Sequence, residues 1–336
     1  MGKKIVSVST VKNESDIIES FCRHTLSFCD EMYICDDNST DQTPEILEKL
    51  VEEGLMITVL QSAKHVIKIN GIIINDLIKI AIKNSQPDFI LALDADEFLM
   101  PFPGRNVNVR EVLENIPDTA YNTFAAYWVQ FMPTSFKRKN NVFLPSYFTK
   151  YINDFTMNPT EFKVMFHSSC ITERNTTVNT GNHNLFYLNE NNHYEIVEKK
   201  VVPELMLAHC TLRSVPQLIM KSIIFSMHTI CTPESQKGNI ITNERYWTVY
   251  ELLRKKGYIT EGDLRAILAM TYRSDRNNIK ENVNFANYYW NLHYELKYTD
   301  YSKVDENYLA FILTNYESVI TNLVEKLDAL QNPPAQ

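Results

Sequence analysis

The chain has 336 residues, of which 44% are hydrophobic and 22% are charged, and its formal net charge at pH 7 is −8. This composition is typical of a soluble globular protein with one large domain or two smaller ones. The acidic balance argues against a general nucleic-acid-binding protein, which needs a basic face. The N-terminal residues do not form a signal peptide, and no apolar run is long enough to span a membrane, so the sequence predicts a cytoplasmic protein.

Strand and helix patterns alternate in the N-terminal third of the chain. Apolar segments predict strands at 4–9, 31–35, 56–60 and 89–93. Amphipathic segments between them predict a helix capped by Ser15, a helix with Thr43 as cap and Pro44 in its first turn, and a helix over 72–82. This alternation predicts an α/β fold with a mostly parallel central sheet flanked by helices.

The pattern changes to that of a mixed sheet after residue 120. Aromatic and β-branched segments predict strands at 124–131, 142–151, 162–166 and 195–202, and the chain then predicts helices at 216–229, 245–255, 261–271 and 308–330. We therefore expect a first domain over 1–230, with an alternating half (1–100) and a mixed-sheet half (101–230). An α-helical C-terminal extension over 231–336 is expected to follow it.

Acidic residues follow two of the predicted parallel strands. Asp36 and Asp37 come after the second strand, and Asp94 and Asp96 come after the fourth. Ligands of such sheets bind beyond the carboxyl ends of the strands, so these side chains should share one crevice. Two carboxylates at the end of a buried strand need a positive partner, and Mg²⁺ or Mn²⁺ would bind both them and a nucleotide diphosphate. Taken alone, the Asp36 segment is better explained as a turn that caps the next helix.

In this arrangement the chain resembles the family-two glycosyltransferases, which share the GT-A fold. The resemblance covers three stretches in order, 11–14, 35–41 and 93–98. It is closest to a bacterial subgroup whose metal motif continues as D-A-D-E-F. Residues 180–183 and 209–214, with the following Gln217 and Lys221, are also similar to that subgroup.

The resemblance implies transfer of a sugar from a nucleotide-diphosphate sugar, with UDP favoured. It also implies that 1–230 is the catalytic domain, with 1–100 as the nucleotide-binding half and 101–230 as the acceptor half. Asp36 or Asp37 would hold the base, and Asp94 would contact the ribose or a metal-bound water. Asp96 would bind Mn²⁺ or Mg²⁺, with His209 favoured over His183 as a further ligand. The full predicted metal set is Asp94, Asp96 and His209. The other predicted nucleotide-sugar contacts are Val11, Lys12, Asn13, Glu14, His183, Arg213 and Lys221.

A general base for the acceptor hydroxyl is expected because the family is predominantly inverting. Glu97 is the candidate beside the metal motif, and a purely structural carboxylate is an equally good interpretation of it. Asp154, Glu161 and Glu173 lie in the acceptor half without a motif that favours one of them. Trp128 and Trp290 are candidates for stacking on sugar rings, although buried aromatic packing is the commoner role.

Two other functions compete with the transferase. A sugar nucleotidyltransferase would need a glycine-rich phosphate loop after the first strand, whereas residues 9–14 contain no glycine. A degenerate, non-catalytic module would bind a glycan or a protein, and the intact acidic pair Asp94 and Asp96 counts against it. The expected acceptor is a glycan, a lipid-linked molecule or a protein of the bacterial cell surface. Peripheral contact with the inner face of the membrane and self-association through the C-terminal helices are left open.

Overall fold

The computed structural model describes residues 2–62, 70–117, 123–133, 138–152, 162–173, 176–179, 181–231, 244–260, 263, 267 and 285–304. The chain packs as two compact units. Unit 1 comprises Met1–Thr211 and Ser274–Asp300, and unit 2 comprises Leu212–Arg273 and Tyr301–Gln336. The domain boundary expected at residue 230 stays a prediction. A segment close to the C-terminus thus returns to the N-terminal unit.

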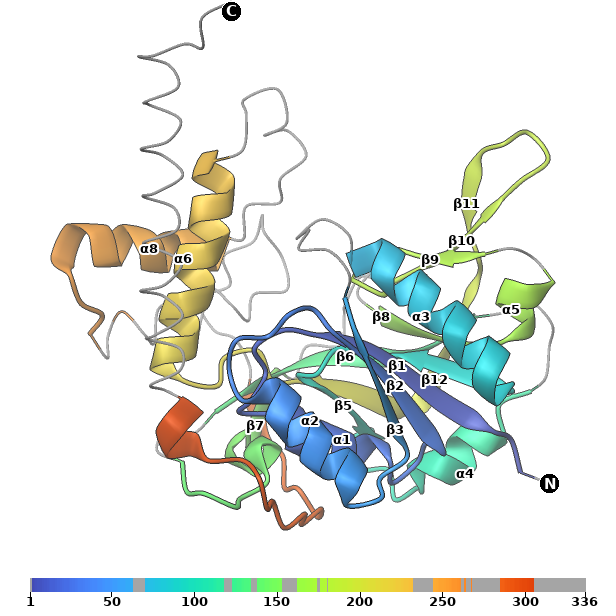
Figure 1. The fold of residues 1–336 in the computed structure, drawn as a ribbon, viewed down its shortest axis with the longest axis horizontal. Helices are drawn as coiled ribbons and strands as arrows, with labels where there is room; N and C mark the ends of the chain where they lie inside the picture. The colour runs from blue at the N-terminus through green and yellow to red at the C-terminus, as the bar shows by residue number, and fades with distance from the viewer. Residues whose placement is uncertain are drawn as a thin grey trace, which may run out of the picture. The chain divides into compact units, whose positions relative to one another are not determined.

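Unit 1 is built on a large sheet that is flanked by helices (Figure 1). The strands run in the order β13-β7-β6-β8-β4-β1-β2-β3, and β12 pairs with both β5 and β6. Strands β4, β1, β2 and β3 are parallel, as expected from the alternating sequence. The strand bounds are β1 (Ile5–Val11), β2 (Glu31–Asp36), β3 (Ile57–Gln61), β4 (Phe89–Ala92), β5 (Glu97–Pro101), β6 (Thr123–Met132), β7 (Lys150–Ile152), β8 (Phe162–His167), β12 (Lys199–His209) and β13 (Phe285–Asn287).

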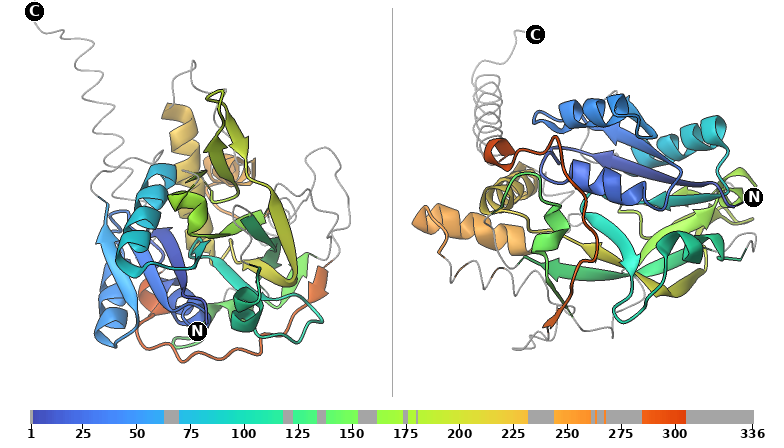
Figure 2. Two further views of the ribbon diagram at one scale, coloured as in Figure 1. Left: turned by 90° about the vertical axis from the view of Figure 1, so that its right-hand side faces the viewer. Right: turned by 90° about the horizontal axis from the view of Figure 1, so that it is seen from below.

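Helices cover the parallel part of this sheet on both faces (Figures 1 and 2). Right-handed crossovers from β1 to β2 and from β2 to β3 put α1 (Ile18–Thr25) and α2 (Thr43–Glu52) on one face. The return crossover from β3 to β4 puts α3 (Asn70–Ser85) on the other face. Shorter helical segments are α4 (Val109–Glu114), the 3₁₀ turn η1 (Leu144–Tyr147) and α5 (Ser169–Thr172).

The core under α3 shows why the central strands read as apolar runs. Val6 and Val8 of β1 and Ile90 of β4 share one buried cluster with Leu77 and Ile78 of α3. Strands that are covered on both faces need apolar residues at consecutive positions, and all four residues of β4 are buried. The central parallel strands are therefore buried between the helices that cover the sheet.

A second sheet and two helices complete the described structure. Strands β9 (Thr177–Val178), β10 (Leu185–Leu188) and β11 (Tyr194–Ile196) form a three-stranded antiparallel sheet in unit 1. Unit 2 contains α6 (Val215–Cys231) and α8 (Glu244–Lys256), which pack against each other. None of the helices in the described ranges combines the length and apolar character that a membrane span requires.

Four local predictions are wrong. The helix expected to be capped by Ser15 begins only at Ile18, and the backbone N–H of Ser15 donates to the carboxylate of Asp41. Thr43 is the first residue of α2 and not its cap, and its hydroxyl accepts a hydrogen bond from the N–H of Glu14. The strand expected at 142–151 is divided into η1 and β7, and the one at 195–202 is divided between β11 and β12. The helix predicted over 308–330 lies outside the described residues, as does most of the one over 261–271.

A buried carboxylate ties the returning segment to the N-terminal helices. Glu19 of α1 is 0% exposed, and its two oxygens accept the backbone N–H groups of residues 297–299 at 2.7–2.9 Å. The hydroxyl of Thr299 and the guanidinium of Arg23 also donate to Glu19. Lys297 forms an ion pair with Glu53, the residue that follows α2. One acidic side chain thus satisfies the backbone of a segment far away in sequence.

We expect His24 to make the protein acid-sensitive. Burial lowers the pKa of His24 to about 4, against a partly compensating hydrogen bond to the carbonyl of Leu99. The unfolded chain therefore binds a proton below pH 6.5, whereas the folded chain binds it only near pH 4, so the contribution of His24 to the free energy of unfolding falls over this interval by about 3 kcal/mol. Urea unfolding between pH 7 and 4 measures how the free energy of unfolding depends on pH, and His24→Phe should remove this contribution. Substitution of the exposed His193 should leave this pH dependence unchanged.

Candidate functional site

The loops after β1 and β2 are bound to each other by backbone and side-chain hydrogen bonds. The N–H of Asn13 donates to the hydroxyl of Ser39 at 2.8 Å, and the Asn13 side chain accepts the N–H of Thr40 at 2.8 Å. The N–H of Asp37 donates to the carbonyl of Val11 at 2.8 Å. Asn13 adopts a positive φ of 54°, which asparagine tolerates better than most residues. The predicted pocket residues 11–14 are therefore held beside Asp37.

Asp36 and Asp37 have different surroundings. Asp36 accepts the N–H and the hydroxyl of Ser39, so its carboxylate forms the turn after β2. Asp37 is 6% exposed, and its Oδ2 lies 3.3 Å from the ammonium of Lys12. Its Oδ1 is buried and has no hydrogen-bond partner among the described residues. A buried carboxylate oxygen without a donor is costly, which favours Asp37 as the group that receives a ligand N–H or O–H.

Strand pairing brings the predicted histidine to the acidic motif. In the antiparallel pair of β5 and β12, Glu97 is opposite His209, and in the parallel pair of β12 and β6, His209 is beside Gln130. Glu97, His209 and Gln130 thus form one row across three strands. The N–H of Cys210 donates to the carbonyl of Asp96 at 2.8 Å, which fixes the residue before β5 against the end of β12.

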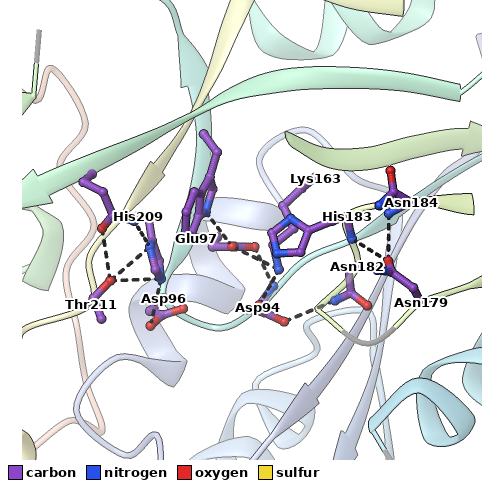
Figure 3. Close-up of polar contacts among 12 residues, drawn as sticks. Asp94, Asp96, Glu97, Lys163, Asn179, Asn182, His183, Asn184, His209 and Thr211 are labelled. Carbon is purple, nitrogen blue, oxygen red and sulfur yellow. Dashed lines mark hydrogen bonds and ion pairs between the residues drawn. The ribbon is translucent and has the colours of Figure 1, made fainter. Parts of the chain in front are cut away.

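Asp96 faces His209 (Figure 3). The Asp96 Oδ2 atom lies 3.5 Å from His209 Nε2, and both side chains are slightly exposed, at 13% and 11%. The imidazole is oriented by three neighbours. Gln130 Nε2 lies 2.8 Å from Nδ1, the hydroxyl of Thr211 lies 3.0 Å from both ring nitrogens, and the ring of Trp128 stacks on the imidazole at 4.5 Å.

Asp94 faces a different partner, the ammonium group of Lys163 (Figure 3). Lys163 Nζ is 2.5 Å from Asp94 Oδ2 and 3.2 Å from Glu97 Oε1, and the lysine side chain is 3% exposed. Asn182 Nδ2 donates to the other oxygen of Asp94 at 3.2 Å. Burial lowers the pKa of Lys163, but Asp94 and Glu97 outweigh it, so the pKa lies above its usual value and the lysine is charged.

Glu97 is enclosed by protein donors. Its carboxylate accepts from Trp128 Nε1 at 2.9 Å and from the N–H of Asp94 at 3.0 Å, in addition to the contact with Lys163. Burial raises the pKa of Glu97 to about 8, and Lys163 acts in the opposite direction. Because the side chain is 0% exposed, this geometry favours the structural interpretation of Glu97 over that of a base that touches an acceptor.

His183 lies on the loop before β10, close to the same cluster (Figure 3). Its ring makes an edge contact with the ring of Trp128, with the centroids 5.9 Å apart, and its backbone N–H donates to the side chain of Asn179. Gly181 has a φ of 86°, and a Cβ added there would meet the His183 ring at 3.0 Å. Glycine is therefore required for the turn that places His183 and Asn182.

Arg213 and Lys221, the predicted phosphate contacts, both belong to unit 2. Arg213 is 1% exposed, and its backbone N–H donates to Oε1 of Gln217 at 3.1 Å. Gln217 also donates its own N–H to the hydroxyl of Ser214 at the start of α6, so the 213–217 segment is a helix start. The contact of Arg213 and Lys221 with a diphosphate stays a prediction.

The three predicted metal ligands do not form one cluster. In the described part of the chain, no group of three or more His, Cys, Asp and Glu side chains is placed to hold a metal ion. Asp96 and His209 still fit a divalent cation that takes its other ligands from a diphosphate and water. An imidazole that binds through Nε2 carries its proton on Nδ1, which Gln130 Oε1 could accept after rotation of the amide.

Sequence reasoning missed Lys163 and Gln130, and it assigned Trp128 a different role. Neither Lys163 nor Gln130 stands in a recognisable motif, and only strand pairing brings them to the acidic residues. Trp128 was a candidate for sugar stacking, whereas one face of its ring stacks on His209 and its Nε1 donates to Glu97. Trp290 is 8% exposed and donates to the carbonyl of Phe148, so it packs in the core.

The doubly wound sheet with acidic side chains at its strand ends has the GT-A architecture of nucleotide-sugar transferases. Residues 8–170 match the family model described as glycosyl transferase family 2. This part of the chain is a glycosyltransferase domain, and the protein is a glycosyltransferase. Its placement in the bacterial subgroup with the D-A-D-E-F motif stays a prediction.

Two solved structures are among those to which this chain is similar. One is S. aureus TarS 1-349 in complex with UDP, with a TM-score of 0.39, 11% identity, and coverage of 80% of this chain and 78% of that chain. Another is the mannosyltransferase PcManGT from Pyrobaculum calidifontis with GDP-Man and Mn²⁺, with a TM-score of 0.39, 14% identity, and coverage of 81% of each chain. No curated protein sequence matches the chain.

Proposed function

We propose that the protein transfers a sugar from a nucleotide-diphosphate sugar, with a UDP-sugar favoured, and that it uses Mn²⁺ or Mg²⁺. The acceptor is proposed to be a glycan, a lipid-linked molecule or a protein, and the sugar is attached with inversion. The observation that carries the proposal is the Asp96–His209 pair, 3.5 Å apart, next to the end of the central strand β4. The unpartnered oxygen of Asp37 beyond β2 supports it.

The base, the ribose and the phosphates of a nucleotide diphosphate each have a suitable side chain in this arrangement. Asp37 is suited to the base, because its buried Oδ1 can accept an imide N–H or a hydroxyl. Lys12 is exposed beside Asp37, and its ammonium group can contact the ribose or a phosphate. Asp94 keeps 43% of its side chain exposed despite its ion pair, so its carboxylate can also accept a ligand hydroxyl.

The chemistry follows from where negative charge develops. A nucleoside diphosphate leaves with additional negative charge, which a bound divalent cation stabilises as a Lewis acid. Asp96 and His209 would hold that cation, and Gln130 and Thr211 keep the imidazole in place for it. The stacked Trp128 excludes water from one face of the imidazole and fixes Glu97 at the same time.

Inversion requires a base that removes a proton from the acceptor hydroxyl. Asp154 and Glu161, two of the predicted candidates, lie outside the described residues. Glu173 is exposed at the end of α5. A cytoplasmic location, peripheral contact with the inner membrane face and self-association through the C-terminal helices stay predictions of the sequence.

Thermal unfolding with UDP, GDP or NAD, each with and without Mn²⁺, tests the proposed function. A ligand at a hundred times its dissociation constant should stabilise the chain by about 2.7 kcal/mol. We expect UDP to raise the melting temperature only with Mn²⁺, and NAD to have no effect. If no nucleotide changes the melting temperature, the protein is instead a non-catalytic binding module. Release of free sugar from the UDP-sugar that stabilises best then identifies the donor.

Replacement of Asp37 by alanine tests the base-binding role. We expect the dissociation constant of UDP to rise about tenfold to a hundredfold, because a hydrogen bond to a charged acceptor in a buried site contributes about 1.5–3 kcal/mol. Isothermal titration with UDP and Mn²⁺ measures it. Asp41→Ala is the matched control in the same loop, since Asp41 bonds to backbone N–H groups of Ser15 and Thr43. Equal losses in both variants would contradict the assignment.

A further inference from the structure

Lys163 is a buried cation that the proposed chemistry does not use. It projects from β8, which is antiparallel to both β4 and β6, and its side chain is 3% exposed. Removing an ammonium group from water costs several kcal/mol unless its partners compensate. The two carboxylates within 3.2 Å of Nζ, those of Asp94 and Glu97, supply that compensation.

The contacts of Lys163 divide the acidic motif into two parts. Both oxygens of Asp94 are engaged by protein donors, Oδ2 by Lys163 and Oδ1 by Asn182. Glu97 is engaged by Lys163, Trp128 and a backbone N–H. Asp96, between them in sequence, points to the other side and faces His209 (Figure 3). The same short segment therefore presents one carboxylate to an internal cation and another to an imidazole.

The charges give this division a function. The ammonium group of Lys163 lies within 3.2 Å of Asp94 and Glu97, so the lysine and not a metal ion is the cation paired with these two side chains. We propose that Lys163 is a positioning residue that serves as a built-in cation: it holds Asp94 and Glu97 and leaves a single divalent ion to Asp96 and His209. This inference rests on the proposed function, and it makes Asp94 a contact to the donor and not a metal ligand.

Mn²⁺ binding without nucleotide tests the inference, measured by electron paramagnetic resonance of the free ion. Lys163→Met removes one positive charge beside the site, so we expect Mn²⁺ to bind about tenfold more tightly. Asp94→Asn should weaken binding by a similar factor, and Asp96→Asn should weaken it about a hundredfold. The double variant Lys163→Met/Asp94→Asn restores the charge and should bind Mn²⁺ within about threefold of the wild-type chain.

The double variant also guards against misfolding, because it removes the two partners of an ion pair together. Thermal unfolding of every variant reports whether it folds. If the double variant binds Mn²⁺ as weakly as Asp96→Asn, Asp94 is a metal ligand and this inference alone is wrong. If Lys163→Met binds Mn²⁺ like the wild-type chain, the lysine has only a structural role and the inference is also wrong. A wild-type chain that binds no Mn²⁺ would overturn both this inference and the proposed metal dependence.

Discussion

Replacement of Asp96 by asparagine is expected to lower sugar transfer by about a thousandfold and to leave the fold intact. Asp96 lies 3.5 Å from His209 and is the carboxylate best placed to hold a divalent cation at the departing diphosphate. Stabilisation of developing charge by one fixed group is worth about a hundredfold to a thousandfold in rate, and loss of the cation itself removes more. Initial rates at saturating UDP-sugar and increasing Mn²⁺ measure the effect.

The fold of the Asp96→Asn variant should be at least as stable as that of the wild-type chain. The substitution removes one negative charge from a cluster that also contains Asp94 and Glu97, so it relieves repulsion. Asp76→Asn is the matched control, because Asp76 is 63% exposed on α3 and pairs only loosely with Lys79 at 3.7 Å. Transfer at the wild-type rate by the Asp96 variant would refute the metal role.

Replacement of Glu19 by glutamine is expected to lower the free energy of unfolding by about 3 kcal/mol. Both oxygens of Glu19 accept hydrogen bonds, from the backbone of residues 297–299, from the Thr299 hydroxyl and from Arg23. A glutamine amide can accept at one end only, so its NH₂ group meets donors and leaves a buried group unsatisfied. Urea unfolding measures the loss.

Hydrogen exchange locates the effect of the Glu19 variant. The amides of residues 297–299 should exchange faster, whereas those of the central strand β1 should exchange at rates set by global unfolding. Glu45→Gln is the control, since Glu45 is 55% exposed and its ion pair with Lys49 is an i,i+4 pair on the helix surface. We expect that control to change the unfolding free energy by no more than about 0.5 kcal/mol. Equal losses in the two variants would show that the buried contact is unimportant.

The sequence by itself determined the central sheet and the position of the acidic residues. Buried strands such as β4 are continuous apolar runs, and the helices between them have a 3.6-residue apolar period, so both appear in the local pattern. Parallel strands bring their carboxyl ends to one edge of the sheet, which is why Asp37 and Asp94 could be predicted to lie at related places. The match over residues 8–170 agrees with the predicted fold class.

Only the tertiary structure decided which partner each of those residues has. Lys163 reaches Asp94 because β8 is paired antiparallel to β4. Gln130 reaches His209 because β6 is beside β12. No local sequence motif predicts the register of either strand pair. Asp36 and Asp37 are identical in type, but Asp36 forms the turn with Ser39, whereas Asp37 lies beside Lys12 and one of its oxygens has no hydrogen-bond partner in the described part of the chain. Local pattern records the period of burial along the chain, whereas charge pairing depends on residues that are distant in sequence and meet only after folding.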